Sequence, residues 1–220
     1  MDLMNFEPIR THPQLLLDRA RSEPNVVALR HWRDGVVHAI TWRTYRDRVR
    51  EIALGLVEHG VQHGDHVAVM SSARPEWAFV ALAVQSVGGV VVGVYPTNSP
   101  AEIEQILAHS EAVAFMGETT TELNKVAEIA ARAPKLRLVV GMDTAPSALP
   151  GAITRRTWEE LRTEGARHPS VVSDRLVEMV AATTLDDPAV LFYTSGSRCA
   201  PCDRQRCCGP RASTRRSPVS

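Results

Sequence analysis

Residues 186–197 read Asp186-Asp187-Pro188-Ala189-Val190-Leu191-Phe192-Tyr193-Thr194-Ser195-Gly196-Ser197. The apolar run at 189–193 follows an Asp-Pro pair and contains β-branched and aromatic side chains, which favours a buried strand. Gly196 allows a sharp backbone bend, and the backbone amides with the hydroxyls of Thr194, Ser195 and Ser197 can point at a single anion. This stretch therefore predicts a strand that opens into a phosphate-binding loop.

Upstream of this loop, short apolar runs alternate with helical patterns. The predicted strands are 66–70, 90–95, 112–116 and 136–140, and the predicted helices start at Pro75 and cover 100–110 and 121–133. Ser99 and Glu102 have the spacing of a capping box at the start of the helix at 100–110. Strands alternating with helices at this spacing predict the α/β class, with a mostly parallel sheet and helices on both faces.

The flanking segments contain further elements. A helix is predicted at 14–22, and two strand-like runs at 26–31 and 36–40 surround Asp34-Gly35, a pair typical of a hairpin turn. Thr41 is placed to cap a helix that contains residues 45–59. Thr157 and Glu160 form a second capping box, and another helix is predicted at 174–182.

One uncharged stretch, residues 77–101, is long enough to test as a membrane span. Its Ala- and Leu-rich first part changes at Gly88-Gly89 into a run of valines, and Pro96 interrupts it further. A buried helix followed by a buried parallel strand explains this change better than a span does. We therefore expect no integral membrane span.

The charges are balanced overall but not along the chain. The 220 residues include 25 Lys and Arg and 25 Asp and Glu, so the net charge gives no reason to expect a nucleic-acid partner. Residues 198–220 contain six arginines and a single acidic residue, Asp203, together with all four cysteines. A body without cysteine indicates a reducing compartment, and we expect a cytoplasmic location.

Three alternative sites can be weighed from residue types alone. One alternative is a zinc site formed by Cys199, Cys202, Cys207 and Cys208. Cys207 and Cys208 are adjacent, however, whereas two residues usually separate the cysteines of such a pair in a zinc site. A second alternative is that the arginines of this tail bind nucleic acid or acidic lipid. A solvated tail that binds neither is the favoured interpretation. His59, His63 and His66 flank one turn and admit a metal site, but exposed loop histidines are the preferred interpretation.

The order of several motifs resembles the acyl-CoA synthetase family of acyl-adenylate-forming enzymes. These motifs are Gly64-Asp65-His66-Val67-Ala68, Arg74-Pro75-Glu76-Trp77, Tyr95-Pro96-Thr97-Asn98-Ser99, His109-Ser110-Glu111-Ala112 and the loop Tyr193-Thr194-Ser195-Gly196-Ser197. The Tyr-Pro-Thr-x-Ser form is most similar to the long-chain fatty-acid ligases. The resemblance covers about residues 10–197 and implies the first part of an AMP-binding domain.

The resemblance implies a two-step reaction with fatty acid and CoA as partners and substrates. ATP and the acid give an acyl-adenylate and pyrophosphate, and the CoA thiol then displaces AMP. It assigns ATP binding, assisted by Mg²⁺, to Thr194, Ser195, Gly196 and Ser197, and it assigns no catalytic residue and no metal ligand within this chain.

The sequence departs from the family pattern after Ser197. The family continues Thr-Gly-x-Pro-Lys-Gly, whereas this chain continues Arg198-Cys199-Ala200-Pro201-Cys202-Asp203. We predict a partial domain at 1–197 and a disordered tail at 198–220 that arises from a frameshift in GC-rich coding DNA. A truncated ligase that is inactive alone is then expected. The alternatives are one half of a split ligase, completed by a separately encoded C-terminal half, and a non-catalytic interaction or nucleotide-sensing module.

Overall fold

The centre of the molecule is a six-stranded sheet in the order β7-β6-β5-β3-β4-β8, and every neighbouring pair in it is parallel. The computed structural model describes residues 9–168 and 175–193. The strands are β3 (His66–Met70), β4 (Val90–Gly93), β5 (Ala114–Gly117), β6 (Leu138–Gly141), β7 (Thr154–Thr157) and β8 (Val190–Phe192). The predicted α/β class with a parallel sheet is confirmed.

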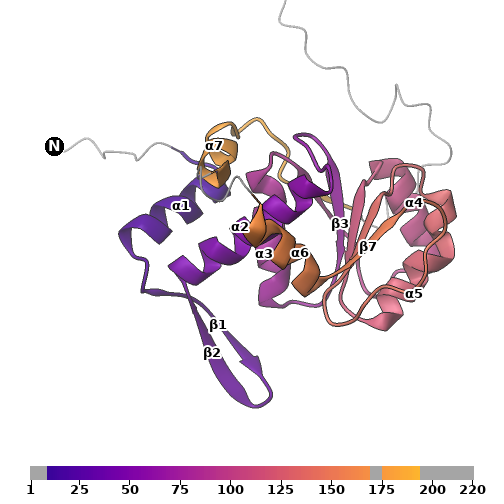
Figure 1. Cartoon of the computed structure of the whole chain (residues 1–220), viewed down its shortest axis with the longest axis horizontal. Coiled ribbons are helices and arrows are strands. Elements are labelled where there is room, and N and C mark those ends of the chain that lie inside the picture. The colour runs from indigo at the N-terminus through magenta and orange to yellow at the C-terminus, as the bar shows by residue number, and fades with distance from the viewer. Residues whose placement is uncertain (1–8, 169–174, 194–220) are drawn as a thin grey trace, which may run out of the picture.

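Helices cover both faces of this sheet (Figure 1). They are α1 (His12–Ser22), α2 (Trp42–Glu58), α3 (Pro75–Ser86), α4 (Pro100–Ser110), α5 (Thr120–Ile129), α6 (Trp158–Arg167) and α7 (Arg175–Ala181), with a 3₁₀ turn at Ala130–Arg132. Helices α4 and α5 lie on one face, and the other five helices lie on the opposite side. This is the arrangement expected when parallel strands are joined by helical crossovers.

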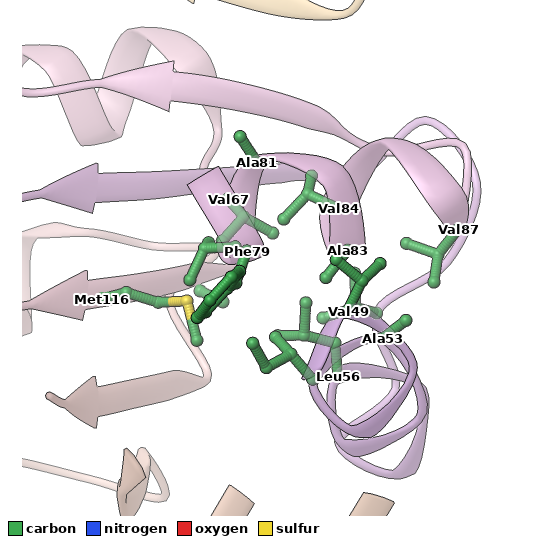
Figure 2. Packing of buried hydrophobic residues seen from close by; sticks show 14 of the residues in the cluster. Val49, Ala53, Leu56, Val67, Phe79, Ala81, Ala83, Val84, Val87 and Met116 are labelled. Atoms are coloured by element: carbon green, nitrogen blue, oxygen red, sulfur yellow. The ribbon is translucent and has the colours of Figure 1, made fainter. Parts of the chain in front are cut away.

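Two hydrophobic cores separate according to the pleat of the strands. Val67 and Val69 of β3 point into the larger core, and Ala68 and Met70 point into the core beneath α4 and α5. Figure 2 shows the larger core, where side chains of α2 and α3 meet Val67 and Met116 of the sheet. Because both faces of β3, β4, β5 and β6 are buried, the sequences of these strands are apolar apart from His66 at the start of β3.

The helix starts follow the capping signals in the sequence. The Ser99 hydroxyl accepts a hydrogen bond from the Glu102 amide, and the Glu102 carboxylate accepts one from the Ser99 amide. Thr157 and Glu160 form the same reciprocal pair at α6, so both predicted capping boxes are confirmed. Thr41 caps α2 as predicted, accepting from the amide of Thr44.

The predicted hairpin is formed by β1 (Val27–Arg33) and β2 (Val36–Thr41), which pair antiparallel. Asp34 and Gly35 both have positive φ angles, 53° and 76°, which is the backbone that a two-residue hairpin turn requires. The hairpin extends away from the helical layer in Figure 1.

The uncharged stretch at 77–101 contains the rest of α3, then β4, as the sequence predicted. Within the described ranges, no helix is long and apolar enough to cross a membrane. Helix α3 instead packs between α2 and the sheet, and β4 is a buried strand of that sheet, between β3 and β8.

One strand was not predicted. Strand β7 has the sequence Thr154-Arg155-Arg156-Thr157 and pairs with β6 at the edge of the sheet. An edge strand exposes one side to water and therefore tolerates charged side chains, so it carries no apolar pattern by which to recognise it. The predicted strand at 90–95 was also too long, because β4 ends at Gly93.

Helices α2 and α6 cross at two glycines that bring the two backbones into contact. A Cβ atom at Gly165 would overlap the carbonyl oxygen of Glu51, and one at Gly55 would overlap the carbonyl oxygen of Leu161. Arg162 of α6 reinforces the crossing by donating to Glu51, with a distance of 2.8 Å between Nε and Oε2. No residue with a side chain fits either glycine position without separating the helices.

We expect Gly165→Ala to destabilise the protein by about 1–3 kcal/mol, because overpacking outweighs the higher helix propensity of alanine. Urea denaturation followed by circular dichroism measures the change. Thr163→Ala, on the exposed side of the same helix, is the control and should leave the free energy of unfolding unchanged or slightly higher. Equal stability of Gly165→Ala and the wild type would contradict the tight crossing.

Candidate functional site

Strand β8 brings the predicted phosphate-binding segment to the carboxyl edge of the sheet. Its three residues pair in parallel with β4, Val190 with Val91, Leu191 with Val92 and Phe192 with Gly93. Tyr193 follows as the last residue described before the predicted loop. Thr194, Ser195, Gly196 and Ser197 lie outside the described residues, so their assignment stays a prediction.

The neighbouring strands make this edge a switch point of the fold. Strand β3 leads into α3 on one face of the sheet, whereas its neighbour β4 leads into α4 on the opposite face. In open α/β sheets, loops that diverge to opposite faces leave a crevice at the carboxyl ends of the strands, and ligands bind there. The predicted loop follows β8, directly beside β4.

Tyr193 is anchored on the α4 side of the sheet. Its hydroxyl lies 2.7 Å from Nδ1 of His109, at the end of α4, and the two rings meet edge to face with their centroids 5.6 Å apart. Burial raises the pKa of the Tyr193 phenol, so the hydroxyl keeps its proton at neutral pH. A protonated phenol can donate a hydrogen bond.

Phe192 lies on the opposite side of β8, over Gly93. A Cβ atom at Gly93 would stand 2.6 Å from Cε1 of this ring, so the close contact between the two strands depends on glycine at position 93. The Phe192 side chain remains 56% exposed. The end of β8 is thus held by a ring contact on each face.

The loop after β4 is fixed by hydrogen bonds of its own. The amide of Tyr95 donates to the side chain of Asn98, and Nζ of Lys125 donates to the carbonyl oxygens of Pro96 and Asn98 at 2.7 and 2.9 Å. The capping box at Ser99 then starts α4. The segment that borders β8 at this edge is therefore well defined.

A charged network surrounds Arg74, in the loop after β3. The guanidinium pairs with Glu76 and Asp143 at 2.8 Å each and with Glu118 at 3.2 Å. Glu118 follows β5 and Asp143 follows β6, so one arginine joins the carboxyl ends of three strands. Glu118 also accepts a hydrogen bond from the amide of Ser72.

The network shifts the ionisation of its members. The hydrogen bond to Glu76 is the largest cause that raises the pKa of Arg74, which stays charged. Burial by itself would raise the pKa of Glu76, but the hydrogen bond from Arg74 and the positive charges of Arg74 and Arg33 bring it down to about 2. Both partners are therefore ionised across the physiological range.

These carboxylates do not offer a site for a divalent cation. Each of the three is already paired with Arg74, and no cluster of three or more His, Cys, Asp or Glu side chains with metal-binding geometry occurs at 9–168 or 175–193. His59 and His63 also have separate partners, since His59 pairs with Glu164 at 2.8 Å and His63 with Asp187 at 3.5 Å. The cysteines weighed as zinc ligands lie outside the described part of the chain.

Comparison with known proteins identifies the family. The family model of AMP-binding enzymes matches residues 16–201, which include β8 and the predicted loop. The chain belongs to the AMP-binding enzyme family. The resemblance to acyl-CoA synthetases seen in the sequence is thereby confirmed.

The relatives of this AMP-binding chain include proteins named as long-chain-fatty-acid–CoA ligases. It is 35% identical over 184 residues to long-chain-fatty-acid–CoA ligase FadD15 of Mycobacterium tuberculosis, an alignment that covers 83% of this chain and 29% of the relative. It is 27% identical over 162 residues to long-chain-fatty-acid–CoA ligase heimdall of Drosophila melanogaster, covering 72% of this chain and 23% of the relative. The chain thus spans less than a third of the length of these relatives.

Solved structures show the same fold. A putative long-chain-fatty-acid CoA ligase from Rhodopseudomonas palustris superimposes with a TM-score of 0.59 at 22% identity, covering 69% of this chain and 36% of that one. The R395G mutant of coronafacic acid ligase from Pectobacterium brasiliense gives a TM-score of 0.66 at 18% identity, covering 83% and 33%. At these identities the likeness concerns architecture alone.

The sequence did not reveal the residues that organise this edge. Arg74 was recognised only as part of a helix start, because its partner Asp143 is 69 residues away. His109 and Tyr193 are 84 residues apart and were seen only within separate motifs. The alternating strands and helices do predict that such segments converge at the carboxyl edge, but not which side chains meet.

Replacing Glu76 by Gln should flatten the acid dependence of stability. The carboxyl has an ordinary pKa of 4.5 and a folded pKa of about 2, so its stabilisation is complete above about pH 4.5 and is lost as the pH falls toward 2. We expect the free energy of unfolding to drop more between pH 6 and pH 3 in the wild type than in Glu76→Gln, as measured by urea denaturation.

Glu128→Gln, on the exposed side of α5, is the matched control for removing a carboxylate. Identical acid dependence of the wild type and Glu76→Gln would show that the Arg74 network does not stabilise the folded state.

Proposed function

We propose that this chain forms the nucleotide-binding part of a ligase that activates a long-chain fatty acid with ATP and transfers it to CoA. The observation that carries the proposal is the match to AMP-binding enzymes over residues 16–201, together with 35% identity to a protein named as a long-chain-fatty-acid–CoA ligase. Fatty acid, ATP and CoA are therefore the proposed substrates. The proposed location is the cytoplasm, in keeping with the absence of cysteine from the first 198 residues.

The proposed chemistry has two substitutions. A carboxylate oxygen of the fatty acid attacks the α-phosphorus of ATP, and the bond to the bridging oxygen breaks to release pyrophosphate. The CoA thiolate then attacks the acyl carbon and expels AMP. The first step concentrates negative charge on the β- and γ-phosphates, and hydrogen-bond donors held in place lower its barrier.

Thr194, Ser195, Gly196 and Ser197 are the proposed donors for these phosphates. Three features of the described residues support this assignment: the strand that precedes the loop pairs with β4, one of the two strands that form the switch point, its last side chains are anchored on both faces, and the adjoining β4 loop is fixed. Mg²⁺ would share the phosphate charge, as is usual for ATP. The carboxylates around Arg74 are not proposed as ligands of Mg²⁺.

A chimera tests the proposed first step. Residues 1–197 would replace the matching part of FadD15, so that the remainder of a ligase is present. We expect fatty-acid-dependent exchange of labelled pyrophosphate into ATP, and a Ser195→Ala loss on the order of 10²-fold, typical of removing one donor to developing charge. Ser147→Ala, which alters an exposed loop hydroxyl, is the control and should retain full exchange.

A chimera that melts cooperatively but gives no exchange would contradict the proposed function. Full exchange activity in Ser195→Ala would be compatible with the proposed reaction, but it would contradict the assignment of residues 194–197 as the phosphate donors.

The same proposal treats the chain after Ser197 as foreign to the ligase sequence, although the family match extends four residues further, to residue 201. Their content of six arginines and four cysteines differs abruptly from that of the preceding residues. We expect the gene, translated in its other frames from the codon of Ser197, to encode Thr-Gly-x-Pro-Lys-Gly or a close variant. Sequencing of genomic DNA measures this, and the absence of the pattern from all three frames would make the tail a genuine part of the protein.

A further inference from the structure

The outer face of the β1–β2 hairpin is apolar, although it is exposed to water. The register pairs Trp32 with Val37 and Arg30 with Ala39, so these four side chains share one face of the hairpin. Trp32 is 73% exposed and Val37 is 47% exposed, and Arg30 and Ala39 are exposed as well. The solvated face of an antiparallel sheet normally carries polar side chains. This face instead carries a tryptophan ring, two small apolar side chains and one arginine, with no acidic residue.

The body of the protein holds the hairpin by its other face. Leu29 and Ile40, near the base of the hairpin, pack against the larger core. Arg33, near the tip, pairs with Glu76 of α3 at 3.1 Å. The hairpin otherwise extends away from the helical layer (Figure 1), and Val36 beside the turn is 56% exposed. The tip is therefore apolar and exposed, and it is held in a fixed direction.

The charge of this region is opposite in sign to that of the body. Residues 26–46, which form the hairpin, its flanks and the start of α2, contain four arginines and one acidic residue, Asp34. Residues 47–168 contain 15 acidic and 11 basic residues. Because one end of the molecule is cationic and the rest is anionic, a negatively charged surface attracts the protein with the hairpin foremost.

Two of these arginines have no carboxylate partner. Arg30, on the outer face of the hairpin, and Arg43, in the first turn of α2, form no ion pair within the part of the chain that the structure describes. Arg33 and Arg46 are each paired with a carboxylate. Asp34 opposes the positive charge, but its φ of 53° belongs to the turn that forms the tip. The outer face therefore keeps a net positive charge beside its apolar side chains.

An anionic lipid bilayer matches both properties of this face. Tryptophan is favoured at the membrane interface, where the ring lies at the level of the headgroups. Apolar side chains combined with basic ones bind such an interface from one side without spanning it, and each basic residue near an anionic surface strengthens binding about fivefold. A nucleic acid or an acidic peptide would pair with the arginines but would leave Val36 and Val37 in water.

We propose that the outer face of the β1–β2 hairpin is a peripheral membrane-binding surface for an anionic bilayer. Trp32 and Val37 enter the interface, and Arg30 lies against the headgroups. The inference goes beyond the proposed function and does not depend on it, because it rests on the hairpin and not on the carboxyl edge of the sheet.

Sedimentation with vesicles tests the inference on the full 220-residue chain. The probes are vesicles of phosphatidylcholine and phosphatidylglycerol in equal parts, and vesicles of phosphatidylcholine alone. We expect the wild type to bind the anionic vesicles more tightly, and to bind them less as sodium chloride is added. Trp32→Ser should weaken this binding about tenfold, the effect of removing one large apolar side chain, and Arg30→Gln should weaken it about fivefold.

Matched variants show whether these losses belong to the hairpin. Leu185→Ser removes an exposed apolar side chain elsewhere, and Arg167→Gln removes an exposed arginine at the end of α6, so both should bind as the wild type does. Brominated lipid quenches tryptophan within the interface and should reduce the fluorescence of the wild type but not that of Trp32→Ser, because the other three tryptophans pack against the larger core. Thermal unfolding shows that each variant is folded.

Several results would overturn the inference. A folded wild type that does not bind the anionic vesicles excludes a membrane-binding surface. Binding that Trp32→Ser and Arg30→Gln leave unchanged would assign it to residues 198–220, whose six arginines are common to all the variants. Self-association of the wild type that Trp32→Ser abolishes, measured by sedimentation equilibrium, would assign the face to a second copy of the chain.

The remainder of a ligase is a further possible occupant of this face. In the chimera of residues 1–197 with FadD15, iodide should quench Trp32 as it does in the chain alone, measured as the difference from Trp32→Phe in the same background. Protection of Trp32 from iodide in the chimera would show that the ligase itself covers the face, and this result would also overturn the inference.

Discussion

The need to bury both faces of the parallel sheet determines the rest of this structure. The side chains of β3, β4, β5 and β6 are almost all withdrawn from water, so each face must be covered by helices. The chain meets this need by sending α3 to one face and α4 and α5 to the other. The change of face between successive crossovers produces the switch point, so the crevice where a ligand is expected follows from the way the core is covered.

The carboxyl edge is built from interactions that each join segments distant in the sequence. Arg74 connects the loops after β3, β5 and β6, Lys125 of α5 holds the loop after β4, and His109 of α4 holds the end of β8. None of these contacts contributes much to the apolar core. Together they give the edge a defined shape, which a site for a highly charged ligand needs, since flexible donors must be ordered each time they bind.

Much of this fold could be predicted because it depends on local patterns. The apolar runs of β3 and β4, the Asp34-Gly35 turn and the capping boxes at Ser99 and Thr157 each act within a few residues, and the structure contains them all. Strand β7 escaped recognition because Arg155 and Arg156 give it no apolar period at an exposed edge. The pairing of Tyr193 with His109 escaped because it depends on which strands become neighbours, a property of the whole topology.

The crossing of α2 and α6 at Gly55 and Gly165 has a consequence for how the protein is made. Helix α2 is synthesised early, yet the surface that meets α6 stays uncovered until more than a hundred further residues have been added, as the separation of 111 residues between Glu51 and Arg162 shows. The backbones of the two helices meet at these glycines, so this surface of α2 receives its partner only when α6 has been made. The nascent chain on the ribosome therefore carries an unfinished layer, and its completion waits for β6 and β7 to bring α6 into position.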